Sequence, residues 1–178
     1  MNIENPAGLT ALDSKRLLTE LSIFAKNESY TSGSSSNQAF TGSFSALMLG
    51  GRVIPRWYMA VSLTPYSSVG YYFHSSQPIE GAPHESYAAA FTGSGGISKV
   101  SWSNAYLLSR HWSLGANISY LFGNIVLSEQ QSDLVVEKRM HARSLYANLG
   151  IQYHRALTHD LSYTWGVVYG YRQKLNIT

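Results

Sequence analysis

The sequence contains no cysteine, no long apolar run and few charged residues, and each absence excludes a class of protein or site. Without cysteine, the chain forms no disulfide, thiolate metal site or cysteine nucleophile. No stretch approaches the roughly 20 consecutive apolar residues of a transmembrane helix. Charged residues make up 13% of the chain, about half of the roughly 25% that is usual in soluble domains. The composition therefore argues against a water-soluble globular protein.

Aromatic and small polar residues take the place of the missing charges. The 178 residues include 13 tyrosines and 15 glycines, hydrophobic residues make up 44%, and the mean hydropathy is −0.12. Such a chain suits a membrane β-barrel, whose strands turn an apolar face to lipid and a small, polar face to a wet interior. The net charge of +3 comes from scattered basic residues. They form no stripe with stacking aromatics, so nothing supports nucleic-acid binding.

Period-two alternation of apolar and small polar residues is the dominant pattern. It is clearest over residues 161–171, and it recurs over 112–122 and 145–153. These segments match the roughly 9–11 residues that a tilted strand needs to cross a bilayer. Aromatic residues end the apolar stripes, as interfacial girdles do in membrane barrels. The apolar face of the first segment carries Leu161, Tyr163, Trp165, Val167, Tyr169 and Tyr171, and the opposite face carries Ser162, Thr164, Gly166, Val168 and Gly170.

The pattern predicts an all-β fold, an antiparallel transmembrane β-barrel with an up-and-down meander of about seven strands. We expect an N-terminal segment over 1–14 and barrel strands over 15–178. Polar connections over 28–37, 77–84 and 130–136 should be longer than the tight turns near 51–55, 110–111 and 156–159. The glycines of 93–96 predict a kink or bulge; splitting the chain there would give eight strands. The expected strands are 15–27, 38–50, 56–76, 85–109, 112–129, 137–155 and 160–174.

An odd strand number predicts a partial barrel. Bacterial single-chain barrels have an even number of strands, and seven strands would leave open edges with unpaired backbone groups in lipid. Residues 1–6 also lack the basic and apolar regions of an export signal. We therefore expect the chain to be a fragment of a larger barrel in the bacterial outer membrane. The strand count, its closure and the oligomeric state stay open at this point.

Residues Asn5-Pro6-Ala7-Gly8-Leu9, followed by a polar stretch and a first strand, suggest a family. They resemble the Asn-Pro-Ala-Gly-Leu motif of the outer-membrane long-chain fatty-acid transporter (FadL-like) family. Further segments that resemble this family are Gly93 to Ile97 and Ser113 to Gly123. The resemblance implies the N-terminal half of a fourteen-stranded, porin-like barrel that takes up hydrophobic compounds passively. Implied partners are membrane lipid, lipopolysaccharide and a hydrophobic small-molecule ligand, with no cofactor and no enzymatic activity.

The resemblance also gives meaning to an unusual proline in the third expected strand. In the FadL-like family a kink in the third strand opens a lateral gap through which apolar ligand reaches the membrane. The corresponding ligand-binding or lateral-opening residues here would be Pro65, Tyr66, Gly70, Tyr71 and Phe73. The alternative is an ordinary bulge, because proline removes a ladder donor and re-registers the strand.

Several histidines are candidates for other chemistry, each with a simpler explanation. His154, His159 and Asp160 with Ser162 nearby could form a hydrolase triad, but they also suit a solvated turn and no nucleophile elbow is present. His141 and Arg143 could contact lipopolysaccharide or serve an ordinary outer loop. His74 and His84, near Glu80 and Glu85, have no recognised metal-ligand spacing. We therefore predict no catalytic and no metal site.

Two other functions compete with transport. A small closed barrel could anchor or scaffold envelope proteins without transporting anything, and pairing of the first strand with the last would favour it. A soluble, lipocalin-like barrel would turn its apolar face inward. The second is disfavoured because the polar face is glycine, serine and asparagine instead of charged residues.

Overall fold

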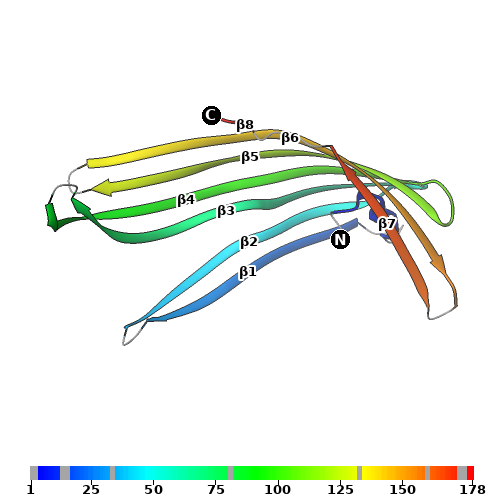
Figure 1. Ribbon diagram of the computed structural model, residues 1–178. Coiled ribbons are helices and arrows are strands. Elements are labelled where there is room, and N and C mark those ends of the chain that lie inside the picture. The colour runs from blue at the N-terminus through cyan, green and yellow to red at the C-terminus, as the bar shows by residue number, and fades with distance from the viewer. Residues whose placement is uncertain are drawn as a thin grey trace. The chain divides into compact units, whose positions relative to one another are not determined.

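The computed structural model consists of one short helix and eight strands (Figure 1). It describes residues 4–12, 17–32, 35–79, 82–131, 134–158, 161–171 and 176–178. Among these residues, no helix is long and apolar enough to span a membrane. The elements are the 3-10 helix η1 (Pro6–Ala11) and the strands β1 (Leu17–Ser32), β2 (Ser35–Ile54), β3 (Trp57–Ile79), β4 (Ala82–Leu107), β5 (Trp112–Gln131), β6 (Leu134–Ala156), β7 (Ser162–Gly170) and β8 (Asn176–Ile177).

The strands form one antiparallel meander, which confirms the predicted fold class. Their order is β1-β2-β3-β4-β5-β6-β7, and the two-residue β8 pairs with β6. The β1–β2 hairpin runs from Leu17↔Gly51 to Ser32↔Ser35, with a register shift between Ser22 and Ile23. In the described part of the chain, β1 and β7 end this order and are not paired with each other. The sheet is therefore open, as expected of a partial barrel.

The prediction of long polar connections between the strands is wrong. The described residues of 28–37, 77–84 and 130–136 lie mostly in strands. Their serine and asparagine content suggested loops, but each residue that extends a hairpin ladder satisfies its own backbone groups whatever its side chain. The β2–β3 turn is tight as predicted, and Arg56 adopts a positive φ of 69° there.

The three glycines of 93–96, Gly93, Gly95 and Gly96, lie within β4 without breaking it. The strand is continuous from Ala82 to Leu107, so the eight-strand division at this point does not occur. Gly95 has a φ of 111°, which residues with a Cβ rarely adopt. A Cβ at Gly95 would also lie 3.2 Å from the Ile125 Cα of β5. Glycine is thus required here for both the backbone angle and the close approach.

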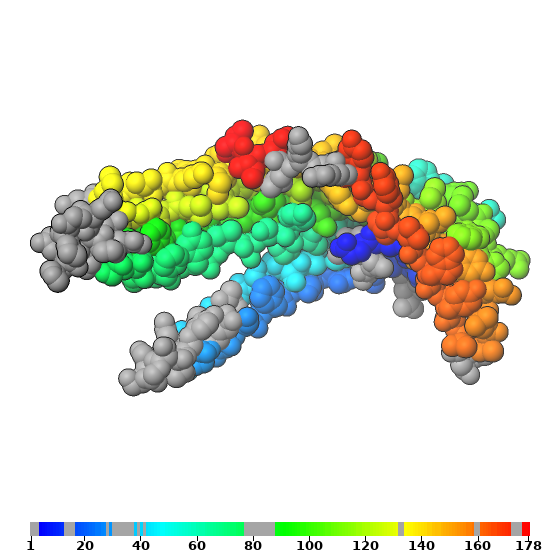
Figure 2. Space-filling model, in the orientation of Figure 1, coloured from blue at the N-terminus to red at the C-terminus, as the bar shows by residue number. Residues whose placement is uncertain are grey.

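Two compact units divide the chain, and they are described separately. The first comprises Met1–Thr64, Val100–Ser119 and Ala147–Tyr171, and the second comprises Pro65–Lys99, Tyr120–Tyr146 and Arg172–Thr178. In the first unit, Leu9 of η1 packs with Tyr58, Ala60 and Ala105. Figure 2 shows η1, in blue, beside the orange residues of β7. In the second unit the corresponding cluster is small: Ile97, Leu121 and Ala142, with Ile125 packed against it.

Candidate functional site: a turn docked on the small-residue face of the sheet

The two faces of the sheet have the opposite burial from that of a soluble protein. On β5, Leu114 and Ile118 are 46% and 48% exposed. The alternating residues Ser113, Asn117 and Ser119 are 3%, 3% and 1% exposed. Soluble proteins bury their large aliphatic side chains and expose most serine and asparagine. The apolar face of this sheet is thus uncovered, and the small polar face is the packed one.

Hydrogen bonds between strands satisfy much of the buried polar face. The Ser101 and Ser119 Oγ atoms lie 2.8 Å apart, and Ser103 Oγ donates to Asn117 Oδ1 at 3.1 Å. Two buried atoms on this face, Ser62 Oγ and Asn148 Oδ1, have no partner among the described residues. This face is therefore a hydrogen-bonded polar layer and not a hydrophobic core.

Helix η1 owes its shape to Asn5 and Pro6. Asn5 Oδ1 accepts a hydrogen bond from the Ala7 N–H at 3.1 Å, which caps the helix. Pro6 follows at the first helical position, where its fixed φ suits the helix and its missing N–H is not needed. Thr10 Oγ1 donates to the Ala7 carbonyl at 3.0 Å. The cap, the proline and the Thr10 bond restrict the conformation of the turn.

Three glycines on successive strands receive this turn. A Cβ at Gly115 of β5 would lie 2.8 Å from Ala7 Cα, and one at Gly150 of β6 would lie 3.0 Å from Pro6 Cδ. A Cβ at Gly166 of β7 would overlap Asn5 Nδ2. At Gly115 the neighbouring atoms are backbone, so only glycine leaves room for η1 there; at Gly150 and Gly166 the nearest atoms belong to the Asn5 side chain.

Hydrogen bonds and one buried leucine hold the turn in place. Ser113 Oγ donates to the Ala7 carbonyl at 3.1 Å, and Asn5 Nδ2 donates to the Ile151 carbonyl of β6 at 3.4 Å. Leu9 is almost fully buried among Tyr58, Ala60 and Ala105. The predicted motif residues Asn5 to Leu9 therefore form one turn, and this turn contacts strands β3 to β7. Sequence reasoning missed the receiving glycines, although all three lie on the small-residue faces of predicted strands.

Aromatic side chains cluster on the exposed apolar face beside the tight turns. Trp112 lies edge-on to Tyr153 and Trp165, with ring centroids 4.9 and 5.5 Å apart. Tyr163 is 5.8 Å from Tyr153, and His111 stacks on Tyr153 at 5.9 Å. The cluster joins β5, β6 and β7 at one end of the apolar stripe, which is where an interfacial girdle lies in membrane barrels.

The five residues predicted to line a lateral opening all lie in a continuous β3. Pro65 and Tyr66 are exposed, and nothing lies within 4 Å of a Cβ built at Gly70. The Tyr71 ring lies over Gly93 of β4, where a Cβ would be 2.5 Å from Tyr71 Cζ. Phe73 stacks on Phe91 with centroids 5.0 Å apart. Tyr71 and Phe73 thus pack β3 against β4.

The histidine candidates have ordinary partners or fall outside the described residues. His154 Nδ1 lies 2.7 Å from Thr164 Oγ1, and His141 Nδ1 lies 2.6 Å from Asn124 Oδ1. His159, Asp160 and Glu80, and the side chains of His84 and Glu85, lie outside the described residues. In the part of the chain that the structure describes, no three metal-binding side chains converge.

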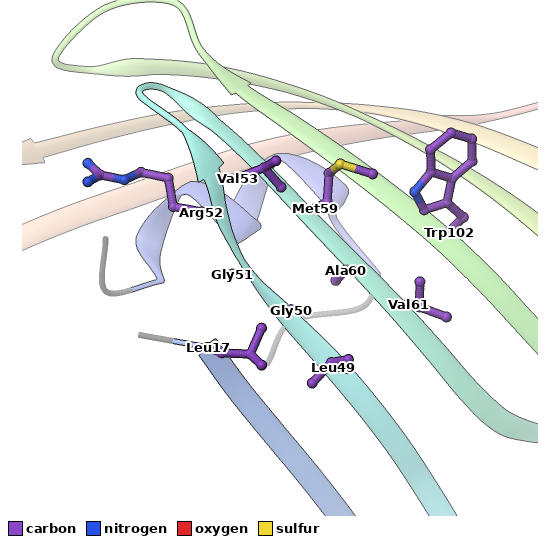
Figure 3. A pocket seen from close by; sticks show the side chains of 10 residues that line it. All are labelled: Leu17, Leu49, Gly50, Gly51, Arg52, Val53, Met59, Ala60, Val61 and Trp102. Carbon is purple, nitrogen blue, oxygen red and sulfur yellow. The ribbon is translucent and has the colours of Figure 1, made fainter. Parts of the chain in front are cut away.

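Shallow grooves mark the apolar face of the first unit. One has a volume of about 390 Å³ and is lined by side chains that include Leu17, Leu49, Met59, Val61 and Trp102. Figure 3 shows Trp102 at one end of this group and Arg52 at the other. A second groove, of about 400 Å³, is lined by Trp57, Tyr106, Leu114 and Leu149 among others. Contact of these apolar surfaces with another apolar group is more favourable than their contact with water.

Comparison with known proteins corrects the family. The family model BamG matches residues 1–178, the whole chain. No curated protein and no solved structure matches. BamG is unrelated to the FadL-like transporters, so the resemblance was wrong, and with it the expected porin-like uptake of fatty acids and other hydrophobic compounds.

The physical basis of that error lies in the motif itself. An asparagine cap, a proline at the first helical position and a glycine are what any short docked turn requires, so unrelated sheets can share them. The lateral opening at Pro65 to Phe73 rested on the same resemblance and loses its basis. The family places the protein at the bacterial outer membrane.

Proposed function

The chain belongs to the BamG family, and we propose on that premise that it is a structural, non-transporting wall element of the outer-membrane β-barrel assembly machinery. It would be an integral membrane sheet that acts without catalysis. The family supports the link to barrel assembly. The observation that carries the integral placement is the reversed burial, with Leu114 and Ile118 uncovered and Ser113, Asn117 and Ser119 packed.

Energetics favour lipid as the neighbour of the apolar face. Leucine, isoleucine and valine side chains on β2, β3, β5 and β7 are about half exposed, so an apolar surrounding would stabilise each by roughly half of the 1.5–3 kcal/mol that full burial gives. Soluble monomers rarely expose contiguous patches of that kind. Membrane lipid, with lipopolysaccharide in the outer leaflet, is therefore the proposed partner of this face.

Strand lengths are consistent with a sheet that extends beyond the bilayer. Strands β3, β4 and β6 contain 23, 26 and 23 residues, whereas a tilted strand crosses the hydrocarbon in about 9–11 residues. From Trp112 to Phe122 the rise along β5 is about 33 Å at about 3.3 Å per residue. Tilted by about 40°, this gives the height of about 25 Å that is usual for the apolar band of an outer-membrane barrel.

Adjacent valines on β7 allow a matched test of the membrane placement. Val167 lies on the apolar face and is 55% exposed, and Val168 lies on the opposite face and is 41% exposed. We expect Val167→Arg to reduce stable membrane insertion by about 2–4 kcal/mol, as arginine does on the lipid face of barrels. Val168→Arg should be tolerated. The readout is the fraction of protein that resists urea extraction from outer membranes. Equal behaviour of the two variants would contradict an integral sheet and favour a peripheral component.

The assembly role has its own test in the host bacterium. Depletion of the protein should leave newly exported barrel proteins in the unfolded form on unheated gels, while uptake of fatty acids stays unchanged. Normal folding of barrel proteins after depletion would remove the assembly proposal, whatever the arginine variants show.

A further inference from the structure

The outer edge of β7 is an unprotected strand edge in the described sheet. Among the residues that the structure describes, β7 pairs with β6 on one side and has no partner on the other. Its nine residues, Ser162–Gly170, include no charge and no proline, and all are exposed. Sheets that avoid pairing place lysine, proline or bulges on their edges. The other end of the strand order, β1, has such features: a register shift after Ser22 and the charged residues Glu20 and Lys26.

Strand directions restrict what can pair with this edge. Strands β1–β2, β2–β3 and β6–β7 are antiparallel. Gly96 and Gly93 of β4 approach Ser67 and Tyr71 of β3 in descending order, and Ser101 and Ser103 of β4 meet Ser119 and Asn117 of β5 likewise. Contacts of Asn124 with His141 and of His111 with His154 extend this order to β5 and β6. After six antiparallel steps, β1 and β7 run in the same direction.

This parity excludes closure by a second copy. Copies inserted in one orientation have all their β1 and β7 strands running the same way, so any pairing between their edges would be parallel. Outer-membrane barrels pair antiparallel strands. Closing the sheet on itself would likewise join β1 and β7 in parallel. Strand β8 pairs with β6 at Ala142 and Arg143 and does not cover the free side of β7.

We infer that the β7 edge binds one antiparallel strand of a separate outer-membrane barrel polypeptide. Only another backbone satisfies a row of N–H and C=O groups in hydrocarbon. The bound strand would match β7 in pattern, with apolar and aromatic residues beside Tyr163, Trp165 and Val167 and small residues beside Thr164 and Gly166. This pairing would be strand addition to a free edge. The inference rests on the proposed function, because barrel assembly supplies such a polypeptide.

Three tyrosines allow a conservative cross-linking test in the intact protein in its own membrane. A photoreactive phenylalanine analogue replaces Tyr163 or Tyr169, which lie near the two ends of β7, or Tyr120 on the interior strand β5 as a control. After irradiation, mass spectrometry maps the linked residue. Copies labelled with heavy isotopes are mixed in, so that links between two copies are distinguished from links within one. Membrane insertion of each variant is checked first by resistance to urea extraction.

The expected result is a link from both β7 positions to one strand of a different barrel protein. The linked residue number in that protein should fall by about six on moving from position 163 to 169, as antiparallel pairing requires. The Tyr120 position should link only within the chain. Links from β7 to a later strand of the same chain, to a second copy, in rising order, or to no protein would each overturn the inference. The arginine variants on β7 test membrane placement independently, so the two failures are distinguishable.

Discussion

Replacement of Gly115 by alanine should loosen helix η1 without disrupting the sheet. The added methyl would lie 2.8 Å from Ala7 Cα, and the neighbouring backbone atoms of η1 are held by the Asn5 cap. A methyl group forced into a packed site costs about 1–3 kcal/mol. The Gly115→Ala change therefore strains the docked form and leaves the undocked form unaffected.

The docking energy sets the size of the effect. Burial of Leu9 contributes about 1.5–3 kcal/mol, and the hydrogen bond from Ser113 contributes about 1 kcal/mol. The sum, a docking energy of about 2.5–4 kcal/mol, equals or exceeds the strain energy over most of the strain's range of about 1–3 kcal/mol. The turn should therefore stay docked most of the time and open about 5–140 times more often, at about 1.4 kcal/mol per tenfold.

Cysteine labelling measures this opening directly, because the chain has no cysteine of its own. An Ala105→Cys reporter keeps Leu9, which covers this position in the docked form, and reacts with a maleimide only when η1 opens. The rate should rise about 5–140 fold in Gly115→Ala. Gly70→Ala is the matched control, because nothing lies within 4 Å of its Cβ. Equal labelling rates in the two variants, both properly inserted, would refute the docking argument.

Three further substitutions probe the cap of η1 and two contacts between strands. Asn5→Ala removes the cap and the bond to Ile151, and should raise labelling of the Ala105→Cys reporter about tenfold; Asn5→Asp, which keeps only the capping oxygen, should fall between, and a wild-type rate in Asn5→Ala would contradict the role of the cap. Tyr71→Ala uncovers Gly93 and should lower stability to urea by about 1 kcal/mol, whereas Tyr71→Phe should not. Ser103→Ala leaves Asn117 Oδ1 buried without its partner, and should cost about 1–3 kcal/mol in the same unfolding assay; a double variant that also replaces Asn117 by alanine should lose less than the sum.

Local patterns in the sequence were sufficient for the strands and their faces. Period-two alternation over 112–122 and 161–171 predicted β5 and β7, because successive side chains of a strand point to opposite faces. The same alternation separated Leu114 and Ile118 from Asn117 and Ser119, a division that the burial of β5 confirms. Strand ends were harder to predict, since serine-rich stretches such as 28–37 suit loops and hairpin ladders equally well.

Function was misread from a motif too short to identify a family. Residues Asn5 to Leu9 specify a capped turn, and a capped turn is a local solution that unrelated proteins use. A match over the whole chain was needed to place it in the BamG family. The physical content of the motif survives the correction, because the turn packs as its residues require.

The sequence by itself determined that this chain forms long antiparallel strands with one apolar and one small polar face, since both follow from local periodicity. Only the tertiary structure decided that Asn5 meets Gly166 and Ile151, and that Ala7 meets Gly115. Those pairs are separated by more than a hundred residues in the sequence. Their meeting depends on the accumulated register of every hairpin between them, which no local pattern encodes.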